Sequence, residues 1–410
     1  MNSNYPSRIE LFGRHVSGPY VQFLRRMGLD IDVQSAQGAI VFDVRGCRYI
    51  DCIAGYGNCV LGHNDPAVTN AVIEELRSSR PFNLPFIQEV QTRLSCTLAE
   101  MTPGDLECCF FVNSGSEAVE TALKLARLST GKPGVVSTYG AWHGFTTGCM
   151  SVSEPSMCKN FEPLLEHVKH VPYNDVAAVE GAIDDSVGCV IVEPIQAENG
   201  AIVPSVGYLN ALEEICRRRG VLLVFDEVKT GIAKTGRLFA CQHDGAVPDI
   251  LVCGKALGGG VMPIGGIIAR RRVWSKFGLS FPMSSSSGAG NAPACAAALA
   301  TLRKVADDRM CEEAARKGSL LRAKLEKLGA DFPRTIVDIT GAGLLVGLHF
   351  PSAKTASEIV ARCARQGLLV MNAFCARSKI LVEPPVVISD EEIDEVANIL
   401  ARAVAASGDS

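Results

Sequence analysis

The chain has 410 residues, of which 47% are hydrophobic and 20% are charged, and its formal net charge is −4. This length predicts at least two domains in an ordinary, well-packed globular protein, and the negative charge argues against nucleic acid as the main partner. The first residues hold no apolar signal segment and no run of about 18 apolar residues occurs, so neither secretion nor a membrane span is predicted.

Strand-like and helix-like patterns alternate through the middle of the chain. Near-continuous apolar runs separated by helices indicate a mainly parallel sheet that is covered on both faces. The pattern predicts strands within residues 107–115, 131–144, 187–194, 221–227 and 249–255, and helices over 116–130 and 208–220.

The sequence pattern changes after residue 300. A long charged helix is followed by short strands and a last helix, which is typical of a smaller α+β domain. We expect the segment 38–57 to belong to the same domain. The predicted elements are helices over 309–329 and 389–406 and strands within 343–350, 367–372 and 380–384. We therefore expect residues 1–55 to contribute to the small domain, 56–300 to form the large domain, and 301–410 to complete the small one.

One stretch, DILVCGKALGGG at residues 249–260, places Lys255 at the end of an apolar strand and among glycines. A surface lysine in a glycine turn is the simplest interpretation. A phosphate-binding P-loop is excluded, because Asp249 and Ala256 stand where that motif needs a glycine and a serine or threonine. The third interpretation is a partly desolvated lysine whose amine is nucleophilic and forms a Schiff base.

Other polar residues fall at the predicted carboxyl ends of strands, where ligands of such sheets bind. Gly115 and Ser116 open a helix, and a helix N-terminus is suited to phosphate. Asp226 ends an apolar strand, where a carboxylate is costly without a partner. With Lys255 and the aromatic Trp142, these residues predict a pyridoxal phosphate site: an imine-forming lysine, a partner for the pyridine nitrogen, a phosphate site and a stacking ring.

Longer motifs carry a resemblance over nearly the whole chain. They include FFVNSGSEAVETALKLA, AWHG, VIVEPIQAENG, VFDEVKTGIAKTG, GKALGGGVMPIGG and GNAPACAAALATL. The chain resembles class III aminotransferases of pyridoxal-phosphate fold type I, most closely those acting on putrescine or ornithine. The resemblance implies an α/β fold with a large, mainly parallel domain and a smaller α+β domain.

The resemblance also implies roles for individual residues. Lys255 matches the Schiff-base lysine that also shuttles a proton, and Asp226 the partner of the pyridine nitrogen. The remaining matches are Gly115 and Ser116 at the phosphate, Trp142 and Val228 on the two sides of the ring, Ser287 reaching the phosphate of a partner subunit, and Tyr56 and Glu198 at the substrate.

Four departures from the family pattern are informative. Lys229 replaces a glutamine that lies near the cofactor's phenolic oxygen, so we expect it at the cofactor. The segments 233–236 and 287–290 also differ from the usual residues. Leu381 aligns with an arginine that commonly grips a substrate carboxylate, so we expect weak use of simple 2-oxo acids, with Lys229 as a substitute cation; alternatively, the arginine has migrated to Arg377.

The resulting hypothesis is a homodimeric pyridoxal-phosphate aminotransferase acting on an amine and an aldehyde or ketone, with no metal. The alternative is the same cofactor used for elimination, γ-replacement or epimerisation, and a catalytically inactive scaffold is disfavoured by Lys255 and Asp226. Sixteen scattered cysteines without a C-x2-C pair indicate free thiols in a reducing cytoplasm.

Overall fold

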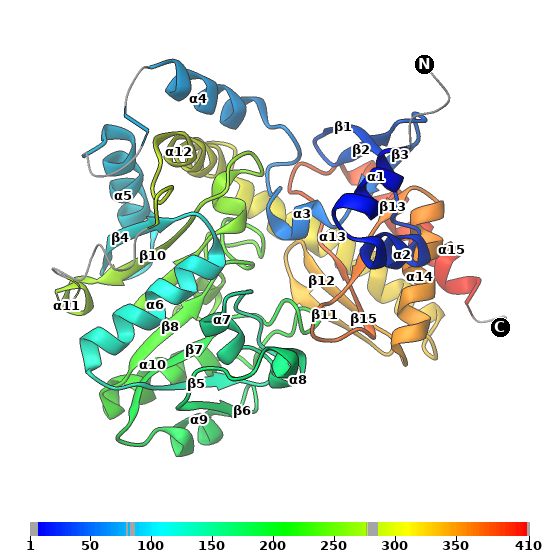
Figure 1. Cartoon of the computed structure of the whole chain (residues 1–410). Coiled ribbons are helices and arrows are strands. Elements are labelled where there is room, and N and C mark those ends of the chain that lie inside the picture. The colour runs from blue at the N-terminus through cyan, green and yellow to red at the C-terminus, as the bar shows by residue number, and fades with distance from the viewer. Residues whose placement is uncertain (1–6, 79–80, 83–86, 276, 278–285, 408–410) are drawn as a thin grey trace.

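The computed structural model describes residues 7–78, 81–82, 87–275, 277 and 286–407. It shows two lobes side by side, one built mainly from the middle of the chain and one from its two ends (Figure 1). Among the described residues, no helix is both long and apolar enough to cross a membrane.

A seven-stranded sheet forms the large lobe, in the order β4-β10-β9-β8-β7-β5-β6. Only β10 runs against its neighbours, so the prediction of a mainly parallel sheet is confirmed. The sequence did not predict β6 or β10. The strands are β4 (Leu106–Val112), β5 (Gly134–Thr138), β6 (Val168–Val171), β7 (Val187–Val192), β8 (Leu222–Asp226), β9 (Ile250–Cys253) and β10 (Gly265–Arg270).

The sheet is buried on both faces because alternate side chains of each strand enter different apolar clusters. On β8, Val224 packs in one cluster with residues of α6, whereas Phe225 packs in the other with residues of α10. The helices of this lobe are α4 (Pro66–Arg77), α5 (Glu89–Met101), α6 (Gly115–Thr130), α9 (Val176–Ala182), α10 (Tyr208–Arg219) and α12 (Ala292–Asp307), with the short α3 (Ala54–Gly57), α7 (Thr147–Ser151), α8 (Pro155–Cys158), α11 (Arg271–Trp274), η1 (Lys159–Phe161), η2 (Ala240–His243) and η3 (Lys255–Gly258).

Local sequence signals fix the ends of α6 and α10. The Ser114 side chain caps the start of α6 by accepting a hydrogen bond from the Glu117 amide at 3.2 Å. Glycines in the left-handed conformation end both helices, Gly131 after α6 and Gly220 after α10.

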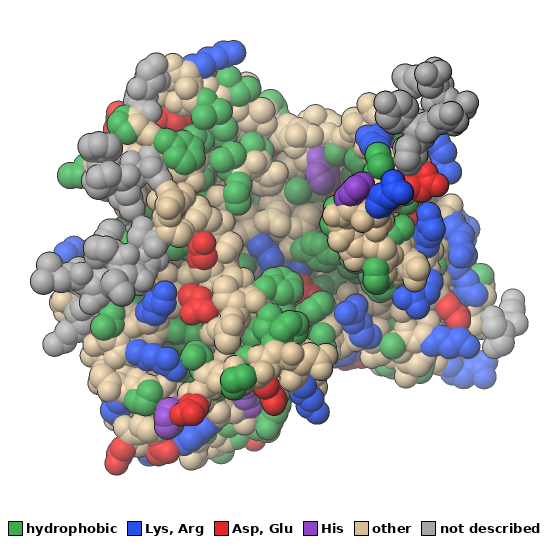
Figure 2. All heavy atoms as spheres, viewed as in Figure 1, with side chains coloured by type: hydrophobic (Ala, Val, Ile, Leu, Met, Phe, Trp, Pro, Cys, Tyr) green, Lys and Arg blue, Asp and Glu red, His purple; other side chains and the backbone are tan. Residues whose placement is uncertain are grey.

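The small lobe holds two four-stranded sheets, ordered β1-β2-β3-β13 and β11-β12-β15-β14. β3 pairs in parallel with β13, so a strand from the N-terminal segment lies beside one from the C-terminal segment. Its elements are α1 (Arg8–His15), α2 (Gly18–Met27), β1 (Val33–Gln37), β2 (Ile40–Asp43), β3 (Arg48–Asp51), α13 (Met310–Asp331), β11 (Asp338–Ala342), β12 (Leu345–His349), α14 (Ala353–Arg365), β13 (Leu368–Leu369), β14 (Met371–Asn372), β15 (Lys379–Val382) and α15 (Asp390–Ala405). The surface is hollowed between the two lobes, and hydrophobic side chains border the hollow (Figure 2).

Candidate active site

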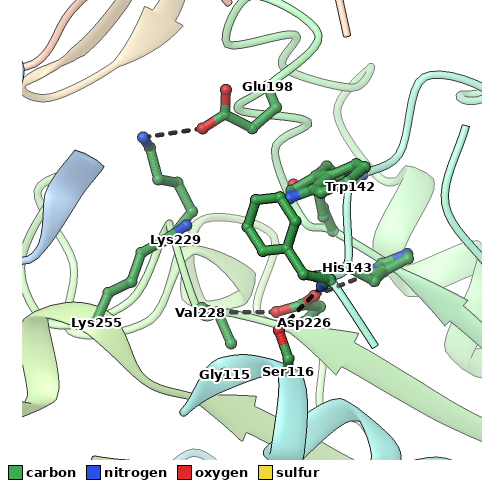
Figure 3. Close-up of a pocket in the computed structure, with 12 residues that line it drawn as sticks. Gly115, Ser116, Trp142, His143, Glu198, Asp226, Val228, Lys229 and Lys255 are labelled. Carbon is green, nitrogen blue, oxygen red and sulfur yellow. Dashed lines mark hydrogen bonds and ion pairs between the residues drawn. The ribbon is translucent and has the colours of Figure 1, made fainter. Parts of the chain in front are cut away.

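A pocket lies at the carboxyl edge of the large sheet, where parallel strands deliver their following residues to one place. The wall of this pocket includes Lys255 after β9, Asp226 at the end of β8, Glu193 after β7, and Gly115 and Ser116 after β4. The structure thus brings together residues that are up to 140 positions apart in sequence (255 − 115). Figure 3 shows Lys255 and Asp226 in the same close-up as the start of α6.

Lys255 begins η3 with a positive φ of 41°, a conformation that costs energy for a residue with a side chain. No described residue accepts a hydrogen bond from its Nζ, although the amine lines the pocket. Burial, and after it the charge of Lys229, lower the pKa of Lys255. An amine with these properties is suited to nucleophilic attack on a carbonyl group.

Asp226 is buried and does not lack partners. One carboxylate oxygen lies 2.7 Å from His143 Nδ1, and the other accepts a hydrogen bond from the Val228 amide at 3.0 Å. His143 Nε2 is buried and has no partner among the described residues. The motif AWHG contains His143, but no sequence pattern pairs it with Asp226, which lies 83 positions later.

Glu193 adds a second buried carboxyl group to the pocket wall. Its Oε2 accepts a hydrogen bond from the Trp142 amide at 3.0 Å, which places the backbone of the aromatic residue. Burial, and then the charge of Asp226, raise the pKa of Glu193 well above its usual range. This carboxyl group therefore carries its proton more readily than a solvent-exposed one.

The start of α6 forms a cradle for an anion. The amides of Gly115 and Ser116 belong to the first helical turn and donate to no described residue. A Cβ atom on Gly115 would come within 2.6 Å of Val228 Cγ1, and one on Gly144 within 2.3 Å of Ser116 Oγ. These glycines let Val228 and Ser116 pack close to the helix start, and the free amides there fit a phosphate group.

A second cavity of about 580 Å³ adjoins this pocket and shares Trp142, Phe145, Glu198 and Lys255 with it. The predicted substrate residues Tyr56 and Glu198 both line this cavity. Its wall is rich in aromatic rings, namely those of Tyr20, Phe23, Tyr56, Trp142, Phe145 and Phe374. The rings of Trp142 and Phe374 meet edge to face with centroids 4.5 Å apart.

Tyr56 lies in α3, whose residues Ala54 to Gly57 all have positive φ, from 48° to 88°. Asp51 holds the start of this left-handed turn, because its Oδ1 accepts hydrogen bonds from the amides of Ile53 and Ala54 at 2.8 and 3.0 Å. The other oxygen, Oδ2, lies 2.8 Å from His63 Nε2. The Asp51 hydrogen bond, and then that of Cys59, raise the pKa of His63 to about 10.

We expect His63→Gln to destabilise the protein most at acidic pH. The folded-state pKa of His63 is about 10, above the unfolded value of about 6.5, so its stabilising effect is complete below about pH 6.5 and is lost as the pH rises through 10. Urea unfolding should show a loss of about 1.5–3 kcal/mol at pH 6 and a smaller loss at pH 9. The exposed His15→Gln serves as a control, and a difference that grows with pH would contradict the assignment.

Other predicted residues lie as follows. Val228 and Lys229 both line the cofactor pocket. Lys229 is not a free cation, because its Nζ donates hydrogen bonds to three protein oxygens. Ser287 is exposed on a turn next to Ser286, whose Oγ accepts from Asn113 Nδ2 at 2.7 Å, and it lines neither cavity.

Leu381 is buried on β15 in an apolar cluster with Ile195, Ala197 and Leu345, and it does not line the substrate cavity. Arg377 does line that cavity, with its guanidinium 5.3 Å from the centroid of the Phe374 ring. No described carboxylate forms an ion pair with Arg377. Besides Lys255, the described basic residue on the wall of this cavity is thus Arg377, the position considered above for a migrated arginine.

Comparison with known proteins agrees with this geometry. The sequence model of the family Aminotransferase class-III matches residues 24–404. The ornithine aminotransferase of Toxoplasma gondii is 30% identical, with 99% of each chain covered and a TM-score of 0.87. The acetylornithine aminotransferase of Elizabethkingia anophelis is 28% identical over 97% of this chain and 98% of that one, with a TM-score of 0.83. An engineered thermostable omega transaminase is 25% identical, with 98% of this chain and 99% of that chain covered and a TM-score of 0.89.

Proposed function

Because the chain belongs to the class-III aminotransferase family and is a pyridoxal-phosphate-dependent aminotransferase, we propose that Lys255 holds the cofactor and that the aromatic cavity beside it selects the substrate. The observation that carries this proposal is the Lys255 amine, which lines both cavities and donates to no described residue. Borohydride trapping of the cofactor's carbonyl carbon on this amine is the test.

Pyridoxal phosphate, when bound, supplies an aldehyde that condenses with amines and a ring that withdraws electrons from the reacting carbon. Lys255 would be the residue that attaches the cofactor, and its free amine would serve as the base that moves protons at the reacting carbons. The Asp226 carboxylate would pair with the cofactor's ring nitrogen, and His143 and the Val228 amide keep that carboxylate oriented. The free amides of Gly115 and Ser116 would hold the phosphate, and Trp142 and Val228 would lie against the ring.

For the substrate, we propose an amine on an extended apolar scaffold, with Arg377 binding a carboxylate of one reaction partner. Six aromatic side chains give the cavity a largely apolar wall, which suits a hydrocarbon or aromatic body better than a short dicarboxylate. Arg377 rests on Phe374, and the Phe374 amide donates to Glu198 Oε2 at 3.1 Å, so the arginine is attached to a fixed loop. A guanidinium that forms no ion pair with a described residue can bind a substrate carboxylate through two parallel hydrogen bonds.

Arg377→Gln should lower kcat/KM about tenfold to a hundredfold for a carboxylate-bearing partner, because a hydrogen bond to a charged group contributes about 1.5–3 kcal/mol. The same variant should leave kcat/KM unchanged for an amine of equal length without the carboxylate. Half-reaction rates with such a matched pair of amines measure both effects.

The exposed Arg365→Gln on α14 is the control, because Arg365 lines a different cavity. Equal losses for the two amines would show that Arg377 supports the loop without reading the carboxylate. No loss for either amine would refute the proposed subsite.

We also propose that the enzyme is a cytoplasmic homodimer in which Ser287 reaches the phosphate site of the partner subunit, with domain boundaries near residues 55 and 300. The role of Ser287 at the partner's phosphate site is supported by its exposure, which leaves the side chain accessible to a partner. Ser287 follows Ser286, whose Oγ accepts a hydrogen bond from Asn113 Nδ2. The sixteen cysteines, eleven of them buried, support a reducing compartment. A fully active monomer in light scattering would contradict the shared site.

A further inference from the structure

A second lysine, Lys229, is buried beside Lys255 in the cofactor pocket, and its ammonium is completely occupied by the protein. Its Nζ donates to Glu383 Oε1 at 2.8 Å, to Glu198 Oε1 at 3.2 Å and to the Tyr56 carbonyl at 3.2 Å. An ammonium has three N–H groups, so these acceptors use all of them. Figure 3 shows the Lys229 side chain directed toward Glu198, above Lys255.

Among the described residues, Lys229 is the one cation that forms an ion pair with either of these two carboxylates. The side chains of Glu198 and Glu383 are 11% and 3% exposed. Lys234 is also close, but its ammonium donates to the Glu383 and Pro384 carbonyls, at 2.7 and 2.9 Å. Without Lys229, the pocket would hold two buried carboxylates without an ion-pair partner among the described residues.

These charges act on Lys255 in opposite directions. A nearby cation favours the neutral form of an amine, and nearby carboxylates favour the protonated form. After burial, the charge of Lys229 is the largest influence that lowers the pKa of Lys255, whereas Glu198, Glu383 and Asp226 raise it. Only the neutral amine can attack a carbonyl.

We propose that Lys229 is a positioning residue that sets the charge state of Lys255: by compensating Glu198 and Glu383, it keeps the reactive amine neutral and ready for the cofactor. This inference rests on the proposed role of Lys255. The simplest alternative is that Lys229 has a purely structural role and only connects the segments that carry Glu198, Glu383 and Tyr56.

Charge-matched variants separate the two explanations. Wild type has one positive and two negative charges in this group, a sum of −1. Lys229→Gln alone changes the sum to −2, whereas the double variant Lys229→Gln with Glu383→Gln restores −1 without the ion pair. The conservative Lys229→Arg keeps both the charge and a donor.

The experiment removes the cofactor and measures the rate at which Lys255 captures pyridoxal phosphate between pH 6 and 9.5, by borohydride trapping and peptide mapping. We expect the pH of half-maximal rate to rise in Lys229→Gln, and capture at pH 7 to slow about tenfold if this midpoint rises by about one pH unit. The midpoint should fall in Glu383→Gln. It should lie near the wild-type value both in the double variant and in Lys229→Arg. The other ionisable groups of the pocket, Glu193, His143 and Asp226, are the same in every variant.

An unchanged midpoint in Lys229→Gln, or a double variant that behaves like Lys229→Gln, would overturn the inference and support the purely structural explanation. If Lys229→Gln does not fold, Glu383→Gln still tests the inference, because an unchanged midpoint of the capture rate in that variant would also contradict a role of these charges in setting the charge state of Lys255. Trapped cofactor on a residue other than Lys255 would instead refute the proposed function.

Discussion

Lys255→Ala is expected to abolish covalent attachment of the cofactor and nearly all transamination. Neither of the other two buried lysines of this region has a free amine, because Lys229 donates to three oxygens and Lys234 donates to two carbonyls. Loss of the general base alone costs about 10²–10⁴-fold in rate, and loss of the nucleophile adds to it. Borohydride reduction of the purified enzyme followed by peptide mapping measures the attachment directly.

The fold should survive this substitution, because the Lys255 side chain makes no hydrogen bond or ion pair with any described residue. Near-identical circular dichroism and retained, non-covalent cofactor are therefore part of the expected result. Lys234→Met is the control for loss of a buried lysine away from the reacting atoms. A Lys255→Ala protein that still shows cofactor reduced onto the chain would disprove the assignment.

Asp226→Asn is expected to keep the cofactor but to lose about tenfold to several hundredfold in kcat. The amide has no negative charge to stabilise a protonated ring nitrogen, and a charge-assisted hydrogen bond in a buried site contributes about 1.5–3 kcal/mol before any effect on the reaction. The half-reaction rate with an amine at saturating cofactor measures the loss.

His143→Gln provides the comparison for this variant, because it removes the partner of Asp226 and leaves the carboxylate. We expect a smaller loss there, since the Val228 amide still orients one oxygen at 3.0 Å. If Asp226→Asn retained near-normal rates while His143→Gln did not, His143 would be the group that acts on the ring and the assignment of Asp226 would fail.

The sequence predicted those parts of the site that end strands or begin helices. Lys255, Asp226, Gly115 and Ser116 follow recognisable apolar runs, and parallel topology brings such positions to one edge. β10 was missed because Gly265 and Gly266 begin it and weaken its strand pattern. The connection from β9 to β10 holds only the short η3, so no helical pattern indicates that another strand of the sheet follows.

Pairings between distant segments were not predictable from one sequence. Lys229 was expected at the cofactor as a candidate cation for a substrate carboxylate, but its ammonium donates a hydrogen bond to Glu383 of the small lobe, 154 positions later. Likewise, only the three-dimensional structure shows that Leu381 packs in an apolar cluster while Arg377 lines the cavity. We therefore expect Arg377, and no longer Lys229, to bind a substrate carboxylate.

Amino-group transfer at Lys255 is tested most directly by a single-turnover experiment in which holoenzyme is mixed with an amine donor and quenched with borohydride at successive times. If amino-group transfer occurs at Lys255, the fraction of cofactor trapped on Lys255 should fall before or together with the appearance of one carbonyl product per site, and a carbonyl acceptor should restore it. Carbonyl product that accumulates while the Lys255-trapped fraction stays constant would show that amino-group transfer does not take place at Lys255.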